Sequence, residues 1–345
     1  MRNFKKIAPR ICAVLAFVIL FESVARFAYE GWTTFSLASK RERSDLKGTI
    51  DTLYCGTSIA ARGIQPVILD EALGTTGFNI ATNTQPLKGT YYLIQETAEE
   101  NPVKQIYLVL SVSTLKKEAT DQEYLSAYEY LRTMRWKARY LLSVRSEGLT
   151  VSSLLYSTRI SKYLNLKQVK KNVKKKLYRT VVQRYYGNRG WRARKTSYEG
   201  ERAGKKNGFT GYWDGSKGIA QITEESLEYL YKIADFCREE GIELNLLLTP
   251  ITQDYIDGAG DLDNLDEVCR ALAEEMDANY YNFMLYKERQ TVFTNDLFED
   301  YKHMNVEGSE VFSELLAEVL QSSDPQEYFY DSMEEFKQGL KEEEA

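Results

Sequence analysis

Short apolar runs and amphipathic stretches alternate along the first part of the chain. Apolar runs predict strands over Thr49–Cys55, Gly77–Ala81 and Lys104–Val112, and apolar residues at helical spacing predict helices over Ser58–Leu73 and Pro86–Glu99. The continuous apolar character of the third run is typical of a strand buried on both faces of a parallel sheet.

The same alternation resumes in the last third of the chain. Helices are predicted over Thr223–Glu240, Asp263–Met276 and Val306–Leu320, and strands over Leu244–Leu248 and Tyr280–Met284. Strands that alternate with helices of this length predict an α/β fold with a parallel sheet covered on both faces. In such a sheet, functional groups gather beyond the carboxyl ends of the strands. We therefore expect one domain in two parts, residues 45–130 and 216–322.

A hydrophobic leader precedes this domain. Eleven uninterrupted apolar residues run from Ile11 to Phe21, and a weaker apolar stretch continues to Ala28. Four basic residues come before them: Arg2, Lys5, Lys6 and Arg10. This pattern predicts an uncleaved membrane anchor over residues 1–30, with the main domain outside the cytoplasm by the positive-inside tendency. A cleaved signal peptide is the alternative, and both interpretations imply export.

A basic helical insertion over residues 131–215 separates the two parts of the domain. Residues 131–206 hold 22 Lys and Arg against three acidic residues, which is a net charge of +19. Because the whole chain has a net charge of −5, the residues outside this segment carry −24. A cluster of lysines lies on a predicted amphipathic helix: Lys170, Lys171, Lys174, Lys175 and Lys176.

The charge of this insertion does not decide what it binds. It can pack on the acidic remainder of the chain, or it can contact anionic lipid headgroups or a polyanionic wall polymer. Nucleic acid is not expected, because it does not fit an exported protein. The acidic tail over residues 323–345 is expected to be a frayed helix or disordered.

One histidine limits the available chemistry. His303 is the only histidine in the chain, so a multi-histidine metal site is excluded and any imidazole base must be this residue. Asp300 precedes it by three residues, and Ser58 follows Gly56 at the end of the first predicted strand. The order Ser, Asp, His is one that a serine nucleophile triad can take. A histidine that only packs or caps a helix is the alternative.

Several polar positions follow strand ends and can share one crevice. These are Ser58, Asn83 and Ser113, which follow the first three predicted strands, and His303, which follows the last one. The N–H of Ser58 would lie at the positive end of a helix, where it can stabilise an oxyanion. Ala81, Asn83 and Ser113 are further candidates for the oxyanion or substrate site. No metal or cofactor is expected.

Two sequence blocks resemble the SGNH/GDSL hydrolase superfamily. They are Leu53–Ser58 and Asp300–Asn305, the second followed by Gly308, and the likeness covers roughly Thr49–Val112 and Thr223–Leu320. The chain is most similar to the anchored extracellular branch that includes the D-alanyl transfer protein of teichoic acid synthesis and the polysaccharide O-acetylation proteins. This resemblance implies a flavodoxin-like three-layer fold with Ser58 as nucleophile, His303 as base and Asp300 orienting it.

The chain departs from the family pattern at two places. Ala81 stands near the position of the family's glycine, where only a backbone N–H is needed. The Gly-x-Asn-Asp block is absent, and Leu110–Thr114 takes its place. Losing one oxyanion donor typically lowers the rate about 100- to 1,000-fold, so Asn83 or Ser113 would have to substitute for the missing asparagine.

The expected function is serine-dependent acyl transfer, of the O-acetylation or D-alanylation type, on an extracellular cell-wall or surface polysaccharide. The resemblance implies a membrane-bound O-acyltransferase as the partner that supplies the acyl group. Two alternatives stand beside it: a secreted carbohydrate esterase, and a non-catalytic polymer-binding protein that has kept the fold. The expected location is the cell membrane, with a single span and the main domain extracellular.

Overall fold

One parallel sheet organises the protein. The computed structural model describes residues 4–30, 35–144, 149, 155, 157, 166–177, 187–192, 194–198 and 212–343. Five strands pair in the order β2-β1-β3-β4-β5, and every neighbouring pair is parallel. The strands are β1 (Thr52–Cys55), β2 (Gly77–Asn79), β3 (Gln105–Val109), β4 (Glu243–Leu248) and β5 (Asn279–Asn282). The predicted α/β class and parallel sheet are confirmed.

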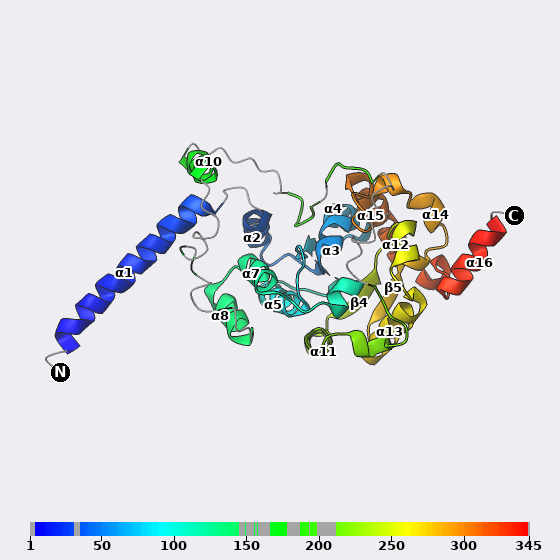
Figure 1. Cartoon of the computed structure of the whole chain (residues 1–345), viewed down its shortest axis with the longest axis horizontal. Helices are drawn as coiled ribbons and strands as arrows, with labels where there is room; N and C mark the ends of the chain where they lie inside the picture. Colours follow the sequence, from blue (N-terminus) through cyan, green and yellow to red (C-terminus); the bar gives the residue numbers. More distant parts are fainter. Residues whose placement is uncertain are drawn as a thin grey trace.

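Helices form two packed groups around this sheet. α3 (Ser58–Gly63) and α4 (Pro66–Leu73) pack against α15 (Val306–Gln321), whereas α5 (Leu87–Ala98) packs against α11 (Glu224–Glu240). In Figure 1 α3, α4 and α15 lie in the upper part of the domain and α11 lies in its lower part. The strand order reverses between β1 and β3, and ligand sites of open α/β sheets lie at such a reversal.

The described part of the chain contains further helices, of which α13 packs on β5. They are α1 (Phe4–Tyr29), α2 (Phe35–Asp45), α6 (Val112–Lys116), α7 (Asp121–Tyr130), α8 (Met134–Ser143), α10 (Leu166–Leu177), η2 (Gly218–Gln221), α12 (Gln253–Gly258), α13 (Leu262–Glu275), η3 (Phe283–Leu285), α14 (Arg289–Val292), η4 (Asn295–Leu297), η5 (Pro325–Tyr328) and α16 (Met333–Glu343).

Several predicted elements end earlier than expected; β2 ends at Asn79 and β5 at Asn282, for example. The helix predicted over Ser58–Leu73 divides at Gln65, whose backbone is extended (ψ 100°) and which precedes Pro66. A residue before proline is sterically kept from the α region, so proline starts a new helix instead of continuing the old one. The third strand ends at Val109, and helix α6 begins at Val112, where the strand had been predicted to continue.

The N-terminal helix extends away from the domain. Within the described part of the chain, α1 is the one helix long and apolar enough to cross a membrane, over the 23 residues Ile7–Tyr29. These residues span about 35 Å at 1.5 Å per residue, slightly more than the roughly 30 Å hydrocarbon core of a bilayer. Its apolar side chains are largely exposed, and Figure 1 shows it projecting from the body. These features fit a membrane anchor or a signal sequence.

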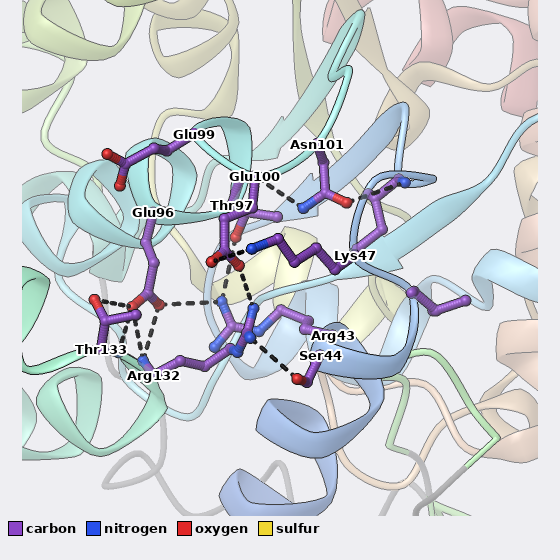
Figure 2. Close-up of polar contacts among 12 residues, drawn as sticks. Arg43, Ser44, Lys47, Glu96, Thr97, Glu99, Glu100, Asn101, Arg132 and Thr133 are labelled. Carbon is purple, nitrogen blue, oxygen red and sulfur yellow. Dashed lines mark hydrogen bonds and ion pairs between the residues drawn. The ribbon is translucent and has the colours of Figure 1, made fainter.

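A buried ionic network fixes α2 to the domain (Figure 2). The Arg43 guanidinium, 2% exposed, lies 3.5 Å from the Glu96 carboxylate of α5 and donates to Thr97 Oγ1 at 3.2 Å. The same carboxylate accepts the backbone N–H groups of Arg132 and Thr133, at 2.8 to 2.9 Å. Burial lowers the pKa of Arg43 to about 10, and the Glu96 charge opposes this shift. The network therefore keeps both charges paired away from water.

The described part of the C-terminal tail includes helix α16, whose first half packs on the domain, whereas a frayed helix or disorder was expected for residues 323–345. Met333 and Phe336 of α16 are buried, and the Met333 N–H donates to Asp263 Oδ1 of α13 at 2.7 Å. Phe336 also lies 5.0 Å from the Arg289 guanidinium. Apolar residues spaced among the acidic ones thus give this segment a packed face. In the basic insertion, residues 178–186 and 199–211, including part of the predicted lysine-rich helix, lie outside the described residues.

Replacement of Arg43 by methionine should lower the free energy of unfolding by about 3 to 5 kcal/mol, because it leaves the Glu96 carboxylate buried without its counter-charge. Urea unfolding of the full chain in detergent measures the change. Lys47→Met is the control, since Lys47 pairs with Glu100 but is 57% exposed, and its loss should change stability by less than about 1 kcal/mol. Equal effects of the two substitutions would contradict the role given to the buried network.

Candidate active site

A close approach of two backbones places Ser58 at the end of β1. Gly56 has φ +139°, and a Cβ there would meet the Val109 carbonyl oxygen at 2.9 Å and the Ala60 Cβ at 3.1 Å. Only glycine fits this conformation and this contact without strain. The chain therefore turns sharply from β1 into α3, and Ser58 becomes the first residue of that helix.

The loop before α15 places Asp300 and His303. Asn305 caps α15 by accepting the Gly308 N–H at 2.9 Å, and a Cβ on Gly308 would lie 2.0 Å from the Leu297 carbonyl oxygen. The Tyr301 carbonyl accepts the side-chain hydroxyl of Thr252 at 2.8 Å. The close packing of Gly308, the Asn305 cap and the hydrogen bond from Thr252 together fix the loop between η4 and α15.

Serine, histidine and aspartate form a continuous hydrogen-bonded chain. Ser58 Oγ lies 2.7 Å from His303 Nε2, although 245 residues separate them in sequence. His303 Nδ1 lies 2.7 Å from Asp300 Oδ2 and 3.0 Å from Oδ1. The backbone N–H of His303 also donates to Asp300 Oδ1 at 3.0 Å. If Nδ1 carries the proton, Nε2 presents its lone pair to the serine hydroxyl, the arrangement that a general base needs.

The electrostatics of the chain favour a neutral imidazole beside an ionised carboxylate. Burial lowers the pKa of His303, an effect that Asp300 partly opposes and that the charges of Arg62 and Lys302 reinforce. Burial would raise the pKa of Asp300, but its hydrogen bond and charge interaction with His303 outweigh this and bring it to about 2. The base is therefore unprotonated and oriented at neutral pH.

An ion pair that the sequence did not reveal joins the two halves of the site. Arg62 lies one turn after Ser58 in α3, and its guanidinium lies 2.6 Å from the Glu299 carboxylate, beside Asp300. Both side chains are about one-tenth exposed. Arg194 pairs with the other oxygen of Glu299 at 2.9 Å but is 58% exposed. The Arg62–Glu299 pair thus links the serine helix to the histidine loop.

A cavity of about 510 Å³ opens beside Ser58. Thr57, Ser58 and Lys302 line one part of it, and Ser113 lines it from α6. Four glutamates line it too: Glu118, Glu123, Glu224 and Glu225. Its mixture of hydroxyl, amide and charged groups suits a polar molecule better than a hydrocarbon. Lys302, next to His303 in sequence, is a cavity residue that the sequence reasoning passed over.

The predicted oxyanion residues do not all reach this cavity. The Ala81 N–H donates to Asn79 Oδ1 at 3.1 Å, and Ala81 is 1% exposed, so this group is already engaged inside the core. Asn83 is not among the residues that line the cavity, although its neighbour Thr84 is. Ser113 does line it, and its hydroxyl lies 3.1 Å from that of Ser111. The first-turn N–H of Ser58 has no acceptor within its own helix and stands nearest the nucleophile.

The other chemistry-bearing groups lie elsewhere. Among the described residues, no cluster of three or more His, Cys, Asp or Glu side chains could hold a metal ion. Cys55, Cys237 and Cys269 are buried, and burial raises the pKa of each thiol, so none is an activated nucleophile. The five predicted polyanion-contact lysines lie on α10, which packs on α1 far from Ser58 in sequence.

Comparisons with known proteins add little. No protein-family model and no curated protein matches the chain. Among solved structures it is similar to a Streptococcus pneumoniae protein named provisionally as a platelet activating factor, with 11% identity and a TM-score of 0.38 over 91% of this chain and 99% of that one. This likeness is too distant to indicate a function, so the function must be inferred from the geometry of the site.

The reaction of Ser58 with a fluorophosphonate should rise with pH to a plateau whose midpoint lies below the ordinary histidine value of 6.5. The reason is that only neutral His303 can accept the hydroxyl proton, and burial favours the neutral form. In Asp300→Asn the pKa of His303 should fall further while the plateau rate drops by at least about 100-fold. Labelling reactions stopped at timed intervals over a series of pH values measure both the midpoint and the plateau rate. A midpoint unchanged by Asp300→Asn would contradict this assignment.

Removal of the Arg62 side-chain charge should change both the rate and the pH profile. Arg62→Gln breaks the link between α3 and the histidine loop, so the labelling rate should fall roughly tenfold or more. It also removes a positive charge that disfavours the imidazolium, so the midpoint should move to higher pH. Arg194→Gln removes the exposed partner of the same carboxylate and should change neither value appreciably. Identical behaviour of the two variants would disprove the positioning role.

Proposed function

We propose that this protein is a membrane-anchored serine acyltransferase of the SGNH type that acts on hydroxyl groups of an extracellular cell-wall or surface polysaccharide. The observation that carries the proposal is the hydrogen-bonded chain Ser58–His303–Asp300 at the carboxyl edge of a parallel sheet. Three residues that suit nucleophile, base and orienter meet at distances of 2.7 Å beside an open cavity.

The chemistry follows from these contacts. Ser58 Oγ attacks the carbonyl carbon of a donor ester while His303 Nε2 takes its proton. The oxyanion that forms is stabilised by the N–H of Ser58, and its collapse expels the donor alcohol, which receives the proton from His303. A polysaccharide hydroxyl then gives its proton to His303 and attacks the acyl-serine. The ester bond passes to the acceptor, and Ser58 recovers its proton.

Transfer fits the site better than free hydrolysis. The Gly-x-Asn-Asp block of the family is missing, and the Ala81 N–H is engaged by Asn79, so few oxyanion donors remain. A weak oxyanion hole suits an enzyme whose activated donor is presented by a partner more than one that hydrolyses free esters. We therefore propose a membrane-bound O-acyltransferase as the source of the acyl group, as the family resemblance implies.

Two further observations support the family assignment and the location. The strand order 2-1-3-4-5 is the one used by flavodoxin-like domains, which agrees with the SGNH resemblance of the two sequence blocks. The span Ile7–Tyr29 follows Lys5 and Lys6, and basic residues favour the cytoplasmic side. The proposal therefore places the domain outside the cell, held by one span.

A fluorophosphonate should label the full-length protein at Ser58, because among the described residues this is the serine whose hydroxyl contacts the imidazole of His303. Intact-mass and peptide analysis measures the adduct. Ser58→Ala and His303→Ala should lose the label by at least about 100-fold, whereas Ser216→Ala, a surface serine bonded to Asp214, should keep it. Labelling that persists in Ser58→Ala would exclude Ser58 as the nucleophile and favour the non-catalytic alternative.

Turnover of an aryl acetate separates transferase from esterase. The transferase should release aryl alcohol slowly in water and faster when a sugar acceptor is added, with the acetyl group recovered on the sugar. A secreted carbohydrate esterase, the second candidate, should turn over the aryl acetate rapidly without any acceptor or partner.

A further inference from the structure

The lysine-rich helix is attached to the end of the membrane-spanning helix. Asn172 of α10, 3% exposed, donates to the carbonyl oxygens of Ala28 and Tyr29 at 3.4 and 3.0 Å. The last carbonyls of a helix have no donor within it, so Asn172 acts as a cap supplied by another segment. Lys176 donates to the Phe27 carbonyl at 2.5 Å and lies 4.9 Å from its ring, and a cation is favourable at a helix C-terminus.

These contacts fix the level of α10 relative to a bilayer. An apolar helix over Ile7–Tyr29 is about 35 Å long, and a hydrocarbon core of roughly 30 Å brings its last turn to the headgroup region. Phe27, Ala28 and Tyr29, which α10 contacts, belong to that turn. Figure 1 shows α10 beside this end of α1. The helix therefore lies where lipid headgroups begin.

The composition of α10 suits a position at the lipid headgroup region. It carries lysines and no acidic residue over Leu166–Leu177, and Lys167, Lys170 and Lys171 are exposed. Leu166 and Leu177 at its two ends are 72% and 69% exposed. Interfacial helices combine cationic side chains for phosphates with apolar ones for the acyl boundary. The chain outside residues 131–206 has a net charge of −24, which an anionic surface repels.

We propose that α10 is a membrane-surface helix that binds the anionic lipid headgroups around the anchor and so holds the domain close to the bilayer. A bilayer is favoured over a wall polymer as its partner because Asn172 and Lys176 hold α10 at the last turn of the span. The inference rests on α1 crossing the membrane and is independent of the acyl-transfer chemistry.

A fluorescent reporter on α10 tests this in the full-length protein. Cys12, the one exposed cysteine of the described residues, is first replaced by alanine, and Leu166→Cys is labelled with an environment-sensitive nitrobenzoxadiazole dye. The protein is placed in nanodiscs of phosphatidylcholine alone or of phosphatidylcholine mixed with phosphatidylglycerol. In the anionic discs the emission should shift to the blue and iodide quenching should fall, and both changes should disappear in high salt. A dye at Ile219→Cys, 47% exposed on η2, should respond in neither disc.

Charge-matched variants identify the contact. Each lysine near an anionic surface strengthens binding about fivefold. The triple variant Lys167→Gln, Lys170→Gln, Lys171→Gln should therefore lower the binding constant of α10 for anionic lipid roughly 100-fold, and the emission shift should be lost. The control replaces Lys217, Lys232 and Lys287 by glutamine, which changes the net charge equally but away from α10, and it should leave the response intact. Since all six side chains are on the surface, both variants should fold.

Three results would overturn the inference. The first is equal emission of the dye in the two kinds of disc. The second is a blue shift in anionic discs that survives the α10 triple variant. The third is a blue shift that anionic lipid does not cause but that appears in phosphatidylcholine discs when soluble poly(glycerol phosphate) is added. The last would make a polymer the partner. Fluorophosphonate labelling of Ser58 in the same discs reports the proposed chemistry separately, because His303 activates Ser58 whether or not α10 binds lipid.

Discussion

The contact between Ser58 Oγ and His303 Nε2 is the interaction around which this molecule is arranged. It joins the end of the first strand to the loop after the last one, so it exists only when the whole sheet is formed and α15 is packed on α3 and α4. Gly56 allows the turn that exposes the serine, and Gly308 allows the approach that places the histidine loop. Arg62 and Glu299 then join the two sides directly.

Much of this arrangement is predictable from the sequence because the pattern that specifies it is local. Apolar runs marked all five strands, and the spacing of Asp300 and His303 anticipated their hydrogen bond. The meeting of Ser58 with His303 followed from the rule that parallel strands end at one edge. The class of fold and the position of Ser58 and His303 at one edge of the sheet could therefore be expected from the sequence.

What the sequence could not supply depends on contacts between distant segments. The Arg62–Glu299 pair joins residues 237 positions apart with no motif to mark it. Ala81 was expected to offer its N–H to substrate, but the nearby Asn79 side chain folds back and accepts it. The acidic tail packs because Met333 and Phe336 meet α13 and Arg289, a surface that composition alone does not show.

The order of the parts along the chain has a consequence for biogenesis. The Ser58 hydroxyl is encoded near the start of the chain and the His303 imidazole near its end, so a nascent polypeptide carries the alcohol before its base has been synthesised. Closing so long a loop adds little entropy penalty, about 0.6 kcal/mol per doubling of its length, once the last helix can dock. Until then the Ser58 hydroxyl lacks the imidazole that lies 2.7 Å from it in the folded protein.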